Sequence, residues 1–165
     1  MAQPLRRLEL DPPSRCLACK RLEMDDPPPR DRVARTGRFS VAHAFNSSLE
    51  GWLVVLPRRH VVRVGDLEDD EARELGPLLR DVSAALRDVV GCEKTYVVQL
   101  AESPGYHHVH FHVVPRQADL PEAHSGPRVF GLLGDAVEPV ADDRQDAIAL
   151  AVRERFAAVG AARAG

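Results

Sequence analysis

The sequence has no long apolar run, very little lysine and no excess of basic charge. None of its hydrophobic stretches approaches the ~18–20 residues of a membrane-spanning helix, and the first ten residues are too polar for a secretory signal peptide. We therefore expect a cytoplasmic protein without a membrane partner. Only Lys20 and Lys94 are lysines. Because the net charge is −3, there is no general basic field, and we expect no nucleic acid polymer as a partner.

Repeats and low-complexity tracts are also missing, so no change of composition marks a domain boundary. The 165 residues fit one domain, and we predict a single domain over residues 1–165. Residues 1–15 contain three prolines and no hydrophobic period, which predicts a loosely ordered lead-in. Three consecutive prolines within residues 25–31 indicate a second irregular stretch.

Alternating or continuous apolar residues predict a β-sheet. The segments RFSVAHAF and WLVVL have the patterns of a half-buried and a fully buried strand. Two later segments, TYVVQL and VHFHVV, have similar patterns. The predicted strands lie at residues 38–45, 52–56, 95–100 and 109–114, with a further short strand at 129–133.

Apolar residues spaced three and four apart predict a long helix over residues 68–90. Pro77 falls inside this stretch and marks a bend or a displaced start, whereas Gly91 occupies the position of a helix C-terminal glycine. A second helix is predicted over residues 144–158. This order of elements indicates an α+β fold with an antiparallel sheet, one long central helix and a C-terminal helix.

Three histidines alternate with apolar residues in HHVHFHVVPR, residues 107–116. In an extended strand, successive side chains point to opposite faces, so His108, His110 and His112 share one face at intervals of about 6.6 Å. The intervening apolar side chains then fill the core. A lone strand histidine is usually a surface or core residue, but three on one face indicate a site with chemistry.

Imidazole titrates near pH 7, so neighbouring rings can be a neutral nucleophile and a cation. On a phosphate substrate, the neutral ring would attack phosphorus, and the charged ring would hold the oxygens and assist the leaving group. The alternative is a catalytic metal ion held by all three rings. The outer pair lies ~13 Å apart at the backbone, which disfavours one shared ion.

The cysteines are Cys16, Cys19 and Cys92. In a reducing compartment, the Cys-x-x-Cys spacing of the first two is typical of half a metal site or of a redox motif. Two buried small side chains are the third interpretation. No thioredoxin-like βαβ pattern surrounds the pair, which disfavours the redox motif. Cys92 stands alone, and we interpret it as a core residue.

These motifs together resemble the histidine-triad (HIT) superfamily, in its zinc-containing, Hint-like branch. The segment HVHFHVV at residues 108–114 looks like the family signature. Upstream, GWLVVLPRRHV at 51–61 is similar to the family's strand that ends in proline, basic residues and a histidine, and CLACKRLE at 16–23 resembles its N-terminal cysteine pair. The match covers residues 16–116 and leaves 117–165 as a C-terminal extension with a helix.

The resemblance implies a homodimer that binds a nucleotide. It further implies a hydrolase or transferase that acts at a nucleoside α-phosphate, on a phosphoramidate or a dinucleoside polyphosphate. His110 falls at the family's nucleophile, where a nucleotidyl-histidine would form. His112 falls at the histidine that binds the phosphate and assists the reaction. No catalytic metal ion is expected at phosphorus.

Four residues fall at the ligand positions of the zinc-containing members, namely Cys16, Cys19, His60 and His108. Zinc favours four tetrahedral nitrogen or sulfur ligands, and a site with all four positions filled has none left for substrate. The resemblance therefore implies a structural zinc ion that pins the N-terminal segment to the sheet edge.

The turn before the triad departs from the family pattern. Many members have Gly-Gln-Ser or Gly-Gln-Thr there, whereas this chain has ESPGYH at residues 102–107. Ser103 and Gly105 are the candidates for phosphate contacts, and turn chemistry explains them equally well. This departure motivates an alternative function, a nucleotide-binding regulatory module with little catalysis.

Several single residues complete the set of candidates. Asn46 is the nearest match to the family's ribose contact, although a turn asparagine is an equal explanation. Trp52 stands where the family often has histidine, and its indole either packs in the core or lines the base pocket. No role is assigned to His43, His107 and His124, which we interpret as surface or supporting residues.

Overall fold

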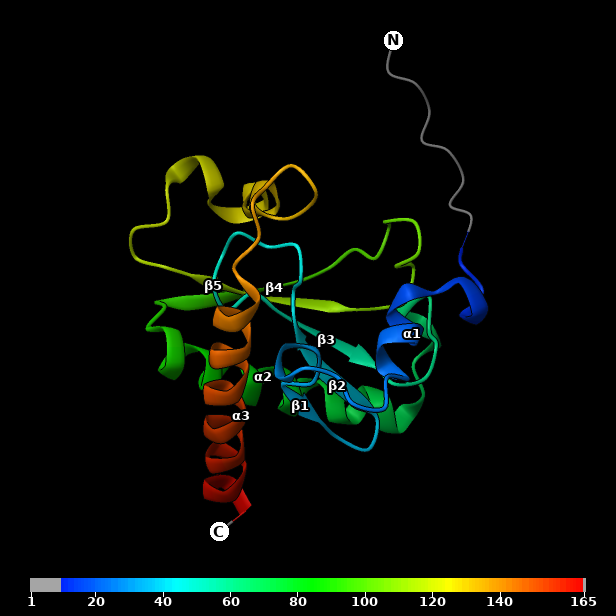
Figure 1. Cartoon of the computed structure of the whole chain (residues 1–165). Coiled ribbons are helices and arrows are strands. Elements are labelled where there is room, and N and C mark those ends of the chain that lie inside the picture. The colour runs from blue at the N-terminus through cyan, green and yellow to red at the C-terminus, as the bar shows by residue number, and fades with distance from the viewer. Residues whose placement is uncertain (1–9, 165) are drawn as a thin grey trace.

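Five strands form one antiparallel sheet in the computed structural model, which describes residues 10–164 (Figure 1). They follow the spatial order β1-β2-β3-β5-β4, and each neighbouring pair is antiparallel. The strands are β1 (Ala34–Arg35), β2 (Phe39–His43), β3 (Leu53–Pro57), β4 (Lys94–Gln99) and β5 (Phe111–Arg116). Together with the helices, this sheet confirms the predicted α+β fold.

The long central helix and the C-terminal helix are both present. The α-helices of the described residues are α1 (Leu17–Leu22), α2 (Asp69–Val90) and α3 (Asp142–Ala164). Short 3₁₀ helices lie at Pro13–Arg15, Pro29–Asp31, Val64–Asp66, Glu122–His124 and Gly126–Leu132. No helix within residues 10–164 is long and apolar enough to cross a membrane.

The start and end of α2 follow from local chemistry. The backbone N–H of Glu68 donates to the Glu71 carboxylate at 2.8 Å, which satisfies a donor that a helix start leaves free. Gly91 ends the helix with a φ of 70°, a left-handed conformation that glycine adopts without strain. Pro77 lies inside the helix, so it does not displace the start.

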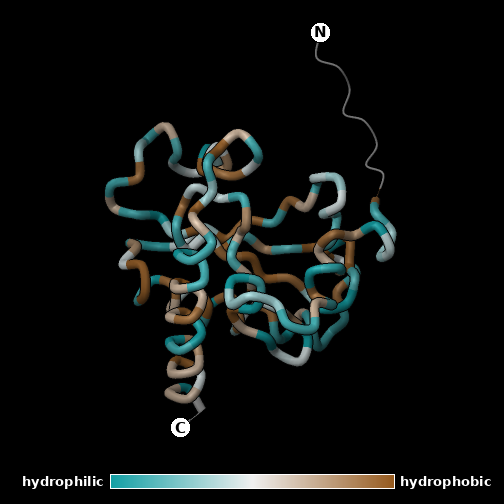
Figure 2. Tube along the Cα trace, viewed as in Figure 1, coloured by the Kyte–Doolittle hydropathy of each residue, from teal (hydrophilic) through white to brown (hydrophobic). Residues whose placement is uncertain are grey.

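The main core lies between one face of the sheet and helices α2 and α3. Side chains such as Phe39, Val41 and Val55 from the strands are buried against Leu86 of α2 and Val152 of α3. Burial of side chains of this size stabilises the fold by about 1.5–3 kcal/mol each. Figure 2 shows hydrophobic residues concentrated along the strands. Both long helices therefore cover the same sheet face, which leaves the other face for a ligand.

The predicted short strand at residues 129–133 is wrong. This segment belongs to the 3₁₀ helix Gly126–Leu132, and a single bridge joins Leu133 to Ser47. A glycine and a proline begin the segment, and its Val129 is buried among Trp52 and Val114. The apolar residues thus serve packing against the sheet and do not pair as a strand.

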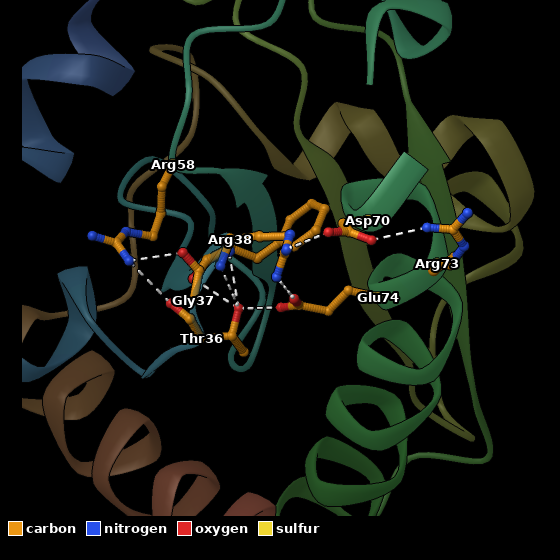
Figure 3. Close-up of polar contacts among 8 residues, drawn as sticks. Thr36, Gly37, Arg38, Arg58, Asp70, Arg73 and Glu74 are labelled. Carbon is orange, nitrogen blue, oxygen red and sulfur yellow. Dashed lines mark hydrogen bonds and ion pairs between the residues drawn. The ribbon is translucent and has the colours of Figure 1, made fainter. Parts of the chain in front are cut away.

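A polar network joins the turn between β1 and β2 to the start of α2 (Figure 3). The Thr36 hydroxyl donates to the carboxylate of Glu74, and the guanidinium of Arg38 donates to Asp70 at 2.7 Å. Arg58, just after β3, donates to the backbone carbonyl of Thr36 at 3.3 Å. Exposed ion pairs contribute little free energy, so the network mainly fixes the hairpin against the helix.

Candidate active site and metal-binding residues

The alternating histidine segment enters strand β5 only at its end. β5 begins at Phe111, so His108 and His110 precede the strand, in contrast to the predicted strand at 109–114. The backbone bends at His108, and directly after it the Val109 N–H donates to the Val61 carbonyl at 2.7 Å, which holds this stretch beside the segment after β3. Val109, Phe111 and Val113 all belong to the main core. The apolar side chains therefore pack inward, as predicted.

His110 and His112 line a cavity of about 840 Å³ on the sheet face opposite α2 and α3. This volume lies in the usual range for small-molecule sites. Its lining includes residues from β2 and β3, from helix α1, from the turn before the histidines and from the segment around Phe130. The first histidine of the three, His108, is not part of the lining. Two of the three predicted imidazoles thus face one cavity.

The tautomer of His110 follows from its backbone contact. Its Nδ1 lies 2.8 Å from the carbonyl oxygen of His108. A carbonyl oxygen only accepts hydrogen bonds, so Nδ1 carries the proton and Nε2 keeps its lone pair. Burial lowers the pKa of His110 below its ordinary value of 6.5, which keeps the ring neutral. A neutral ring with a free Nε2 lone pair is a competent nucleophile.

His112 has the opposite tautomer. Its Nδ1 accepts a hydrogen bond from the indole N–H of Trp52 at 3.0 Å, so its own proton is on Nε2. Burial, and then the neighbouring His110, lower the pKa of His112 to about 3. The sequence-based expectation of a charged ring beside a neutral one is therefore wrong for this structure. The cause is burial of the ring among aromatic side chains. The sequence of the histidine segment alone did not reveal these neighbours.

Cys16, Cys19, His60 and His108 form a cluster that could hold a metal ion, with all ligand atoms within 4.8 Å of one another. The Cys19 Sγ lies 3.2 Å from Nδ1 of His60 and 3.4 Å from Nδ1 of His108. Cys16 Sγ lies 3.7 Å from the same His108 atom. These residues come from three places in the sequence, and the fold brings together the set that the resemblance implied.

The hydrogen bonds of the Nε2 atoms of His60 and His108 support the use of these residues as metal ligands. Nε2 of His108 donates to the carbonyl of Pro57 at 2.8 Å, and Nε2 of His60 donates to the carbonyl of Asp11 at 3.1 Å. Each Nδ1 lone pair therefore faces the cysteines, an arrangement that second partners commonly impose on metal-binding histidines. Burial lowers the pKa of His108 to about 4, so the ring is neutral, as a ligand must be.

The end of the N-terminal lead-in is anchored, in contrast to the loose order predicted for residues 1–15. Residues 1–9 lie outside the described residues. The Asp11 carboxylate accepts from Nδ1 of His107 at 2.6 Å and from the Gly105 N–H at 2.7 Å. The Leu17 N–H donates to the Gly105 carbonyl at 2.8 Å. Helix α1 is thereby docked on the turn before the histidines.

The candidate substrate contacts divide into two groups. Asn46 and Ser103 line the cavity. Gly105 is not part of the lining, and its N–H is taken by Asp11. Its φ of 82° and a closest approach of 2.9 Å from a hypothetical Cβ to Leu17 explain why glycine stands there. The structure thus assigns Gly105 to the docking of α1.

Three cavity residues carry no pattern that sequence reasoning could have used. Phe45 and Tyr106 stack with ring centroids 5.8 Å apart, and the Arg21 guanidinium lies 4.4 Å above the Phe45 ring. All three line the cavity and together form an aromatic and cationic wall that suits a planar base. His43 also lines the cavity, but it is buried and its Nε2 accepts the Gly51 N–H at 3.0 Å, so we interpret it as a supporting residue.

A family model described as the HIT domain matches residues 28–119, which is more than half of the chain. The chain belongs to the HIT family. This membership confirms the resemblance indicated by the alternating histidines. A comparison with curated proteins found no match.

Solved structures share the fold of this HIT protein. A zinc-bound histidine triad family protein from Mycobacterium smegmatis gives a TM-score of 0.67 at 17% identity, over 92% of this chain and 99% of that chain. A histidine triad protein from Sinorhizobium meliloti gives 0.64 at 26% identity, over 82% and 93%. A uridylyltransferase mutant gives 0.63 at 19% identity, over 87% of this chain and 47% of that chain.

Proposed function

We propose that this HIT protein is a nucleotide hydrolase or transferase that acts at a nucleoside α-phosphate and forms a nucleotidyl intermediate on His110. The contact between Nδ1 of His110 and the His108 carbonyl, at 2.8 Å, carries the proposal. It leaves the Nε2 lone pair available in a cavity of nucleotide size. Family membership and the likeness to a uridylyltransferase support nucleotide chemistry in general.

The reaction has two displacements at phosphorus. First, the Nε2 lone pair of His110 forms the bond to phosphorus, and the bond to the leaving group breaks with its electron pair on that group. Second, the oxygen of water or of another acceptor forms a bond to phosphorus, His110 departs as neutral imidazole, and the acceptor's proton passes to solvent. Nε2–H of His112 donates a hydrogen bond to the phosphate, while Asn46 and Ser103 contact the ribose and phosphate.

We propose zinc as the ion for Cys16, Cys19, His60 and His108. Two thiolates and two imidazoles are the donor set that zinc accepts in tetrahedral sites, and four protein ligands make such a site structural. The carbonyls of Asp11 and Pro57, which accept from the Nε2 atoms of His60 and His108, orient the two rings for binding a metal ion through Nδ1. A bound zinc ion would supply a cross-link between α1, the segment after β3 and the histidine segment. His110 and His112 carry the chemistry, without a catalytic metal ion.

The test is a substrate panel with the wild type, His110→Ala and the control His124→Ala. The panel contains an adenosine phosphoramidate and a diadenosine polyphosphate, without added metal. We expect His110→Ala to lose about 10³-fold or more in kcat/KM, and His124→Ala to match the wild type. Rapid quenching and mass spectrometry of the intact wild type should detect a nucleotidyl adduct. Full turnover by His110→Ala would refute the proposal.

One observation favours a second candidate function, a nucleotide-binding module with little catalysis. The Gly105 N–H in the turn before the histidines is taken by Asp11, so this backbone donor does not serve a transition-state phosphate. This candidate predicts mononucleotide binding in calorimetry together with negligible turnover on the same panel. Robust turnover by the wild type would exclude it.

We also propose a homodimer that forms through the edge strand β4. Its outer edge is unpaired among the described strands, and Val97 and Leu100 are 46% and 54% exposed there. An unprotected edge with apolar side chains invites pairing with a second copy. Sedimentation analysis should give a dimer for the wild type and a monomer for Val97→Lys. A monomeric wild type would contradict the proposal.

A further inference from the structure

His112 is enclosed by two aromatic side chains from distant parts of the sequence. The Trp52 ring meets it edge-on with centroids 5.7 Å apart, and the Phe130 ring does so at 5.0 Å. Trp52 is fully buried, and His112 is only 6% exposed. The titratable group that faces His112 is the ring of His110, at 4.8 Å. The His112 ring is therefore largely enclosed by aromatic side chains, and it has one polar neighbour on its Nδ1 side.

That polar neighbour, the Trp52 indole N–H, can donate a hydrogen bond but cannot accept one. The indole N–H of Trp52 lies 3.0 Å from Nδ1 of His112, and indole has no acceptor. An imidazolium on His112 would carry a second N–H, on Nδ1, that points at the indole N–H, so two donors would meet without an acceptor between them. The protein therefore holds His112 neutral, with its single N–H on Nε2.

We propose that Trp52 is a positioning residue that restricts His112 to hydrogen-bond donation, so that the site selects substrates whose leaving group departs through oxygen. Phosphoanhydrides and acyl phosphates of nucleotides belong to this class, and phosphoramidates do not. The inference rests on the proposed function of His110 and names the substrate class for that same site.

The selection follows from the position of the proton. When His110 attacks a P–O linkage, the P–O electron pair goes to an oxygen that leaves as a stable anion and needs no proton. When it attacks a P–N linkage, the pair goes to nitrogen, and the amine must take up a proton as it leaves. A neutral His112 has none to give, because its loss would create an imidazolate. The P–N reaction therefore lacks its acid.

The test uses two adenosine 5′-phosphate derivatives that differ only in the bridging atom, a nitrophenyl ester and the matching nitroanilide. The measured quantity is the ratio of kcat/KM for the nitroanilide to that for the ester. Trp52→His supplies a ring that can accept as well as donate, so we expect this ratio to rise about tenfold or more. The control Val129→Ala removes side-chain volume from the same apolar cluster but keeps the Trp52 indole and its N–H. It should keep the wild-type ratio.

A second measurement does not depend on activity. In ¹⁵N-labelled protein, the nitrogen shifts of His112 at neutral pH should show a bare Nδ1 and a protonated Nε2. Trp52→Phe should lose this pure tautomer. A protonated Nδ1 in the wild type, or an unchanged ratio in a folded Trp52→His, would overturn the inference. Wild-type protein that shows the tautomer but cleaves neither substrate would instead refute the proposed function and, with it, the selection.

Discussion

Acid should destabilise this protein through His112 by an amount that the structure allows us to estimate. The ordinary pKa of 6.5 falls to about 3 in the folded state because the ring is buried. The unfolded chain therefore takes up a proton first as the pH falls. The stabilisation is complete above pH 6.5 and is lost progressively towards pH 3. Between about pH 7.5 and about pH 5, the free energy of unfolding should fall by about 2 kcal/mol from this residue alone.

The assay is urea unfolding of the wild type and of His112→Asn at the two pH values. The amide oxygen of asparagine can accept the Trp52 N–H but does not titrate, so the variant should lose about 2 kcal/mol less than the wild type. Acid-sensitive groups common to both proteins, such as the buried His43, cancel in this comparison. Equal pH dependence in the wild type and His112→Asn would refute the assigned burial and tautomer.

Two further changes test the N-terminal anchor. Cys16→Ser should abolish stoichiometric zinc and lower the melting temperature of the purified protein, as measured by elemental analysis and calorimetry; a variant that keeps a full equivalent of zinc would contradict the site. Gly105→Ala should cost about 1–3 kcal/mol, because its left-handed backbone and its contact with Leu17 both exclude a Cβ. Gly37→Ala meets nothing within 4 Å and should cost far less; an equal loss would argue against the docking of α1.

Local patterns predicted much of the fold. The helix predicted at 68–90 is observed at Asp69–Val90, and the strand predicted at 52–56 is observed at Leu53–Pro57. Both have strong apolar periods and are ended by glycine or proline. The prediction of a strand at 129–133 failed because its apolar residues pack against the sheet residues Trp52 and Val114 from a 3₁₀ helix. A short apolar run has the same pattern in either role.

The sequence predicted those features of the candidate site that depend on residue type and spacing. It did not predict the features that depend on contacts between residues far apart in the chain. The cysteine pair and the alternating histidines were found because their spacings are informative, whereas His60 and the complete set of four proposed metal ligands followed only from the resemblance to the HIT family. The protonation of His112 depends on Trp52, which is 60 residues upstream. It also depends on Phe130, which lies in the C-terminal extension. The anchoring of Asp11 depends on the turn at Gly105. Such pairings leave no trace in any local period.

Phe130 lies beyond residue 119, where the match to the HIT family model ends. The region that the family model matches contains His110 and His112, whereas the segment after it supplies a ring that helps to bury His112. Under the proposed selection, a substitution of Phe130 changes the surroundings of His112, and with them the ratio of P–N to P–O cleavage, although residues 28–119 stay the same.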